Sequence, residues 1–215
     1  MFLSNHKPNK LLLSAVLATA FVVSILLYAG CGNDDSDNNG NNLPTGNWVA
    51  DGIISSGEYA DSRAFGNNYE IHWRSDAQFA YFAVKAFTDG WVAVSFQPDP
   101  SLKKLGADMV LGYVENGQTI IYDLHATGAY GPHPLDTDLG GTYDILEFAG
   151  NETGGYTTIE FKRALSTQDQ YDQDITSGNN NILWAYGTED SLFTGHRAEE
   201  AGQPEGESGY GKITV

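Results

Sequence analysis

The amino-acid sequence predicts an all-β fold, an antiparallel immunoglobulin-like β-sandwich of eight or more strands. Three observations support this prediction. Glycine makes up 25 of the 215 residues and aromatic residues 12%, which indicates many turns and many large apolar side chains. From residue 47 onward no long apolar stripe follows the helical period. Short alternating or aromatic segments lie between turn signals instead, and sheets built from them must each bury one face.

The predicted strands follow one another at short intervals. Residues 69–74 alternate between apolar and polar, whereas 78–86 are apolar on both faces, as in a central strand. Hairpins are expected across Asp89-Gly90 and across Asn116-Gly117, because these dipeptides favour tight turns. The polar segment 164–178 is expected to be a loop with a helical turn. In order, the predicted strands are 69–74, 78–86, 91–96, 108–114, 119–125, 157–162, 181–186 and 212–215.

The first thirty residues have the features of an export signal. Lys7 and Lys10 precede an uncharged run at 11–29 that ends in small residues. The only cysteine, Cys31, follows this run at the place where bacterial lipoprotein signals, which the segment resembles, carry their lipidated cysteine. Tyr28 departs from that pattern, in which an aliphatic residue is usual. The alternative is an uncleaved membrane helix, because the run is just long enough to span a bilayer.

This interpretation divides the chain into a signal peptide at 1–30, a lipidated cysteine with a flexible acidic tether at 31–46, and a sandwich domain at 47–215. Either form of the first segment places the domain outside a bacterial membrane and attaches it there, with the outer membrane or cell surface expected. After residue 30 the chain has 9 basic and 28 acidic residues, a net charge of -19. Such a surface repels phosphate backbones, which excludes nucleic acid as a partner.

Common catalytic signatures are missing from the sequence. It contains no GxxxxGK[ST], GxSxG or HExxH motif, and no spaced calcium loop of the DxDxDG type. The single cysteine excludes disulfide scaffolds, cysteine zinc sites and iron–sulfur clusters. We therefore expect a protein that binds a ligand and is not an enzyme, with no catalytic residues.

Four histidines follow the predicted signal. His72 and His125 lie in predicted strands beside polar neighbours and are expected on a solvated face. His133 lies in a loop between two prolines, and the sequence identifies no partner for it. His196 comes just beyond the strand 181–186, at a sheet edge where ligand-binding loops are common.

Four sequence blocks, in this order and spacing, resemble the DOMON family. The resemblance covers about residues 81–200, with Ser95 where the family usually has glycine. The opening DGIISSGEY at 51–59 is also similar to the start of family 9 carbohydrate-binding modules and of the haem subunits of ethylbenzene-dehydrogenase-like enzymes. The four blocks are GWVAVSF at 90–96, GADMVLG at 106–112, IEFKRALSTQD at 159–169, and ILWAYG at 182–187 followed by His196.

The DOMON resemblance implies haem b, held between a methionine before the G-A-D strand and a histidine after the W-A-x-G strand. His196 matches the histidine and is the expected metal ligand. The methionine position falls near Lys104, where no methionine is present. Lys104 and Met109, the only methionine after the signal, are the candidates for the other axial ligand. A six-coordinate haem would transfer electrons to a redox partner protein, since it leaves no open position for a substrate.

Two other functions remain open. Carbohydrate binding needs aromatic platforms with polar rims. Tyr130 is the best exposed candidate for such a platform, whereas the other aromatic candidates follow the two-residue period of a core. A structural or adhesive surface domain without a small ligand is the third possibility. The aromatic candidates are Tyr69, Trp73, Trp91, Tyr130 and Trp184.

Overall fold

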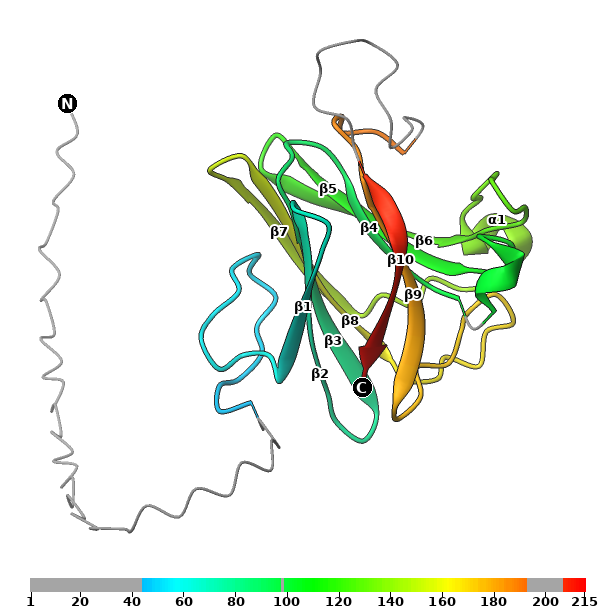
Figure 1. Ribbon diagram of the computed structural model, residues 1–215, viewed down its shortest axis with the longest axis horizontal. Helices are drawn as coiled ribbons and strands as arrows, with labels where there is room; N and C mark the ends of the chain where they lie inside the picture. Colours follow the sequence, from blue (N-terminus) through cyan, green and yellow to red (C-terminus); the bar gives the residue numbers. More distant parts are fainter. Residues whose placement is uncertain (1–43, 98, 193–206) are drawn as a thin grey trace, which may run out of the picture. The chain divides into compact units, whose positions relative to one another are not determined.

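The computed structural model describes residues 44–97, 99–192 and 207–215, which form two antiparallel five-stranded sheets packed face to face (Figure 1). Sheet A has the order β1-β2-β3-β8-β7, and sheet B the order β10-β9-β4-β5-β6. The predicted all-β antiparallel sandwich is confirmed. The strands are β1 Asp61–Phe65, β2 Tyr69–Ser75, β3 Phe79–Ala86, β4 Val92–Phe96, β5 Asp108–Glu115, β6 Gln118–His125, β7 Glu147–Thr153, β8 Tyr156–Ala164, β9 Asn179–Tyr186 and β10 Ser208–Thr214.

Two short helical segments complete the described elements, η1 at Pro100–Leu102 and α1 at Asp136–Leu139. None of the described helices is long and apolar enough to cross a membrane. Cys31 and the predicted signal at 1–30 lie outside the described residues, as does most of the predicted tether.

Alternating side chains from both sheets build the core between them. Every second residue of each central strand points inward, because side chains on a strand alternate between its two faces. Phe82 and Phe161 of sheet A pack with their ring centroids 5.2 Å apart, and Phe82 also meets Phe96 of sheet B at 5.4 Å. The same core contains Tyr69 and Trp73, which are almost fully buried. Neither of these two aromatics is therefore available as a sugar platform, in agreement with the two-residue period of a core.

Two edge strands were missed by sequence patterning. β1 carries four exposed residues out of five, and β7 contains Gly150 and Asn151, so neither shows a clear apolar alternation. Each pairs with only one neighbour at the margin of sheet A. An edge strand with one solvated side needs little apolar pattern, which explains why neither strand is recognisable from sequence.

The structure corrects two predicted connections. β3 and β4 do not form a hairpin across Asp89-Gly90 but belong to different sheets. The Thr88 hydroxyl donates to the Gly187 carbonyl and accepts from the Gly90 N–H, which turns the chain towards β9. The segment 165–178 contains no helical turn. The second predicted hairpin, β5–β6 across Asn116-Gly117, is confirmed, with positive φ values of 52° and 75° at its two turn residues.

The segment before β1 lies against the outer face of sheet A, where it is held by hydrogen bonds to one buried carboxylate. Glu160 of β8 accepts hydrogen bonds from the N–H groups of Asp51 (3.0 Å) and Gly52 (2.7 Å) and from the Tyr59 hydroxyl (2.7 Å). Burial raises the pKa of Glu160, whereas these three donors oppose that rise. The opening DGIISSGEY block thus has a structural role in closing this face.

A buried ion pair joins the two sheets at one end of the sandwich. Arg163 of β8 contacts Asp108 of β5 through Nη1, and its Nη2 lies 3.3 Å from the carboxylate of Asp172. Asp123 and Asp136 are buried nearby. Burial and mutual repulsion raise the pKa of Asp172 to about 6, of Asp123 to about 7 and of Asp136 to about 8. Raised pKa values of this kind keep part of the cluster protonated near neutral pH, because one guanidinium does not balance four carboxylates.

Replacing Arg163 with methionine should lower the free energy of unfolding by about 3–5 kcal/mol, because it leaves buried carboxylates without their cation. Urea denaturation followed by tryptophan fluorescence measures the change. Arg63→Met is the control, since Arg63 is exposed. Among the described residues, its guanidinium donates to the Lys212 carbonyl at 2.7 Å and covers the Phe65 ring. Equal losses in the two variants would contradict a special role for the buried pair.

Candidate functional site

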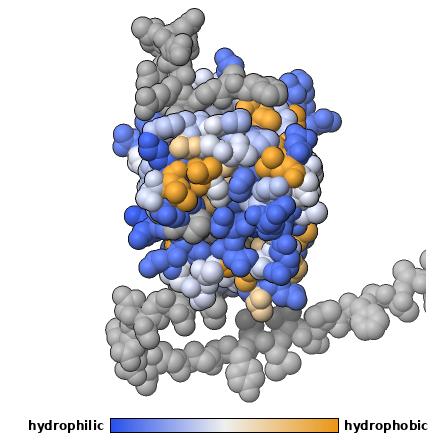
Figure 2. Space-filling view, turned by 90° about the vertical axis from the view of Figure 1, so that its right-hand side faces the viewer, coloured by the Kyte–Doolittle hydropathy of each residue, from blue (hydrophilic) through white to orange (hydrophobic). Residues whose placement is uncertain are grey.

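The outer face of sheet B holds a cavity of about 720 Å³. β4, β5, β6 and β9 form its floor, because their outward residues are small or apolar, as with Ala93, Leu111, Leu124 and Leu183. The volume falls within the usual range for small-molecule and cofactor sites, roughly 300–1,000 Å³. In the space-filling view of this side of the molecule, orange hydrophobic patches lie among blue hydrophilic residues (Figure 2).

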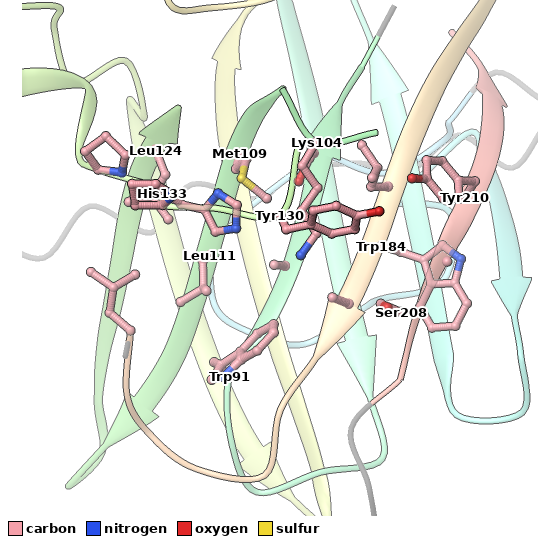
Figure 3. A pocket seen from close by; sticks show the side chains of 18 residues that line it. Trp91, Lys104, Met109, Leu111, Leu124, Tyr130, His133, Trp184, Ser208 and Tyr210 are labelled. Carbon is pink, nitrogen blue, oxygen red and sulfur yellow. The ribbon is translucent and has the colours of Figure 1, made fainter. Parts of the chain in front are cut away.

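Three potential metal-binding side chains share this cavity: Lys104, Met109 and His133 (Figure 3). Met109 is on β5, and strand alternation points it outward, opposite to the inward Asp108. His133 belongs to the segment after β6, and Lys104 to the segment before β5. In Figure 3, the Lys104 ammonium reaches into the cavity, while the sulfur of Met109 and the ring of His133 lie along one side of it.

Backbone contacts hold the segment that carries Lys104. The buried Gln97 side chain donates to the carbonyls of Lys103 (3.1 Å) and Leu105 (2.9 Å). The N–H of Gly106 donates to the Ala126 carbonyl at 2.7 Å, just beyond β6. Partial burial lowers the pKa of Lys104, because the charged ammonium is poorly solvated there. Its neutral amine, which is the form that binds metal, is therefore more accessible than that of an exposed lysine.

The structure thus brings together two of the three cofactor-binding residues predicted from sequence, Lys104 and Met109. His196, the third, lies outside the described residues. Sequence reasoning missed His133, because a histidine between two prolines in a loop gives no signal of what it faces. The fold supplies the reason: the pairing of Leu124 with Leu135 brings the 130–134 segment back over the outer face of sheet B.

The sequence predicts that His72 and His125, the two histidines on strands, lie on a solvated face. Both are instead partly buried. His72 is half-buried with its Nε2 3.6 Å from Glu70, and burial lowers its pKa. The Nδ1 of His125 forms a 2.7 Å hydrogen bond with the Tyr171 carbonyl. Neither of these two histidines lines the cavity.

Trp91 forms one wall of the cavity and depends on a glycine. It is buried on the outer face of sheet B, whereas the sequence placed it in the core strands. Its indole N–H donates no hydrogen bond within the described residues. A Cβ built on Gly187 would overlap the Trp91 indole, so only glycine allows this ring to lie against the end of β9.

A comparison with protein-family models matches residues 66–187, more than half of the chain, to the DOMON domain. The chain belongs to the DOMON domain family. The match includes the whole floor of the cavity on β4, β5, β6 and β9, together with Lys104, Met109 and His133. The resemblance read from the four sequence blocks is confirmed.

Among curated proteins, this DOMON chain is 33% identical to MOXD1 homolog 2 of Drosophila melanogaster over 58% of its own length and 16% of that protein. It is 31% identical to MOXD1 homolog 1 of the same species, over 74% of this chain and 21% of that one. DBH-like monooxygenase protein 1 of Mus musculus is 32% identical, over 57% of this chain and 19% of the relative. The chain therefore spans about a fifth of the length of these relatives.

Two solved structures share part of the arrangement. The cytochrome domain of Myriococcum thermophilum cellobiose dehydrogenase aligns with a TM-score of 0.47 and 11% identity, over 68% of this chain and 74% of that one. The cytochrome b domain of pyranose dehydrogenase from Coprinopsis cinerea aligns with a TM-score of 0.44 and 14% identity, over 68% and 76%.

Substituting Gly187 with alanine should displace Trp91 from the wall of the DOMON cavity and lower the free energy of unfolding by about 1–3 kcal/mol, the cost of overpacking a close contact. Urea denaturation measures the loss, and a red shift of tryptophan emission reports the exposed ring. A double-mutant cycle with Trp91→Phe provides the control. If the two losses simply add, the predicted contact does not exist.

Proposed function

We propose that this DOMON domain binds haem b in the cavity on the outer face of sheet B and transfers single electrons. The observation that carries the proposal is the convergence of a thioether, an imidazole and a partly buried amine in one apolar cavity of about 720 Å³. Apolar walls and a few placed polar groups are typical of cofactor sites. Membership of a family that includes haem b domains supports the same choice.

The side chains present suit the group. Histidine and methionine are established axial ligands of haem iron, and a neutral amine is a further nitrogen donor. Met109 on β5 would be one ligand of the iron, and His133 or His196 would be the nitrogen ligand. Lys104 would be the alternative to Met109 or to the histidine. Leu111, Leu124 and Trp91 would exclude water from the ring. Bound haem would supply a one-electron iron couple whose potential depends on these ligands and on burial.

The same arrangement supports a non-catalytic role. With two of these side chains as ligands, bound haem would offer no position for a substrate, so we propose an electron carrier and not an enzyme. A redox partner protein would meet the exposed rim of the cavity, where Tyr130 and Tyr210 are 77% and 55% exposed. The strongly acidic surface favours a partner with a basic face.

Reconstitution of the purified full-length chain with hemin should give a Soret band that moves on reduction by dithionite. We expect the nitrogen ligand to be His133 or His196. One of the two variants, His133→Ala or His196→Ala, should therefore lose the low-spin spectrum, and the other variant should keep it. Visible absorption and electron paramagnetic resonance spectra measure the change. A hemin titration without a red-shifted band in the wild-type chain would overturn the haem proposal.

Two further variants separate ligation from packing. Met109→Leu keeps the apolar volume of the cavity, so a loss of the thioether should lower the reduction potential while the haem stays bound. His72→Gln is the matched control for the histidine variants, because His72 lies on sheet A and contacts Glu70. Its spectrum should equal that of the wild type.

Carbohydrate binding is the second candidate, favoured by one specific observation. Tyr130 is the most exposed of the large apolar and aromatic side chains in the described residues, and it lies at the rim of the cavity beside Lys104. An exposed aromatic ring beside charged donors is a common way to stack and orient a sugar. Binding on a glycan array that Tyr130→Ala abolishes and His133→Ala leaves intact would favour this function over haem binding.

We further propose that the chain is exported and tethered to a bacterial membrane through a lipid on Cys31. The support is the basic, apolar and small-residue order of 1–30 with the cysteine directly after it. This places the domain outside the cytoplasm, at the outer membrane or cell surface. An uncleaved helix at 11–29 would give the same side of the membrane without lipid.

Radiolabelled palmitate should be incorporated into the wild-type chain during bacterial expression and should be lost in Cys31→Ser. A lipidated cysteine becomes the new N-terminus, so mass spectrometry of the mature protein should begin at residue 31. Cys31→Ala provides a second test of the same thiol. A wild-type chain that keeps residues 1–30 and takes up no palmitate would instead identify an uncleaved membrane helix.

A further inference from the structure

A cluster of buried carboxylates lies at the end of the sandwich, apart from the cavity lining. Asp108 of β5, Asp123 of β6 and Asp172 of the 165–178 segment each bring one carboxylate oxygen within 4.8 Å of the other two. Asp108 and Asp123 are buried on the inner side of sheet B, and Asp172 is partly buried. Three converging carboxylates in a nearly dry site repel one another strongly unless cations balance them.

A separate observation also points to cation binding. Asp136, at the start of α1, is 0% exposed, and neither of its carboxylate oxygens has a hydrogen-bond partner within the described residues. Asp136 follows Leu135, whose backbone pairs with Leu124, the neighbour of Asp123, so it lies beside the same cluster on a fourth segment of chain. The charges of Asp123, Asp172 and Asp108 also raise its pKa. A buried carboxylate without any donor is rare in folded proteins, because its desolvation is not compensated.

The available positive charge does not balance these acids. Within the described residues Arg163 pairs with Asp108 and Asp172, whereas Asp123 and Asp136 have no ion-pair partner. Four ionised carboxylates would exceed the charge of one guanidinium by three. Arg163 contacts Asp108 through Oδ2, and Oδ1 of that carboxylate has no hydrogen-bond partner in the part of the chain that the structure describes. The backbone N–H of Asp144 donates to Asp123 Oδ2 at 2.7 Å but adds no charge.

We propose that this cluster is a calcium site built from Asp108, Asp123, Asp136 and Asp172. Calcium takes six to eight oxygen ligands in flexible geometry, and carboxylate and backbone carbonyl oxygens are its usual donors. Magnesium demands a strict octahedron and keeps several waters, which a nearly dry site does not supply. The four ligands come from separate segments, so the site has no DxDxDG motif by which it could be recognised in the sequence.

Calcium bound here would also brace the neighbouring cavity. The Asp172 segment reaches the chain between Lys104 and Met109 through Gln173, whose side chain donates to the Gly106 carbonyl at 3.0 Å. The Gln173 N–H donates to Asp108 Oδ2 at the same distance. Tyr171 in turn links this segment to α1 by donating its hydroxyl to the Leu139 carbonyl at 2.8 Å. The cation would thus tie together β5, β6, α1 and the 165–178 segment.

Equilibrium dialysis of the EGTA-treated full-length chain against radioactive calcium tests the site. We expect about one calcium ion per chain and a rise in the thermal unfolding midpoint of roughly 5–10 °C at calcium 100-fold above its dissociation constant. Magnesium at the same concentration should give a smaller shift. A wild-type chain that binds no calcium above a buffer blank overturns the proposal.

Asp136→Asn should weaken calcium binding at least tenfold. In EGTA it should unfold at no lower temperature than the wild type, because one repelling charge is gone. A purely structural Asp136 would instead make the variant less stable in EGTA while leaving the calcium response unchanged. The matched control is Asp138→Asn, an exposed residue on the same helix, which should bind calcium like the wild type. Equal losses in the two variants would also overturn the assignment to the buried cluster.

Discussion

Sheet B is apolar on both of its faces, and this constraint shapes the rest of the molecule. Its inner face is covered by sheet A, but its outer face needs a second cover because exposed Leu111 and Leu124 would cost about 25 cal/mol for each Å² of apolar surface left in water. The 103–106 and 130–134 segments supply part of that cover and leave a cavity between them. The cavity is thus a consequence of how the sheet is built.

The second constraint is charge at the end of the sandwich. Arg163 and Asp108 belong to the two blocks by which the chain resembles its family, and the structure shows why those blocks occur together: they form the ion pair between β8 and β5. Fixing Asp108 at this point also fixes Met109 on the opposite face of the same strand. Of these two adjacent residues, Asp108 therefore joins the two sheets and Met109 faces the cavity.

The two-residue period predicted the sandwich and most strands, because inward alternation is a property of the sequence itself. Pairing partners were harder to predict. Asp89-Gly90 is a valid turn signal, but whether β3 and β4 pair or separate depends on Thr88 meeting Gly187, which is 99 residues away. The acid cluster and His133 escaped prediction for the same reason: their neighbours are distant in sequence. Met109 was predictable as a candidate only because it is the single methionine after residue 30.

The location of Met109 on a strand bears on how well the cavity is prepared for a ligand. Its backbone is held between Ser95 of β4 and Leu124 of β6, so its position is fixed before anything binds. His133 stands between Pro132 and Pro134, whose rings restrict the backbone on either side. Side chains that are already ordered lose little entropy on binding, which favours affinity without additional contacts. A sheet with two apolar faces can therefore act both as a structural layer and as a rigid platform for a flat ligand.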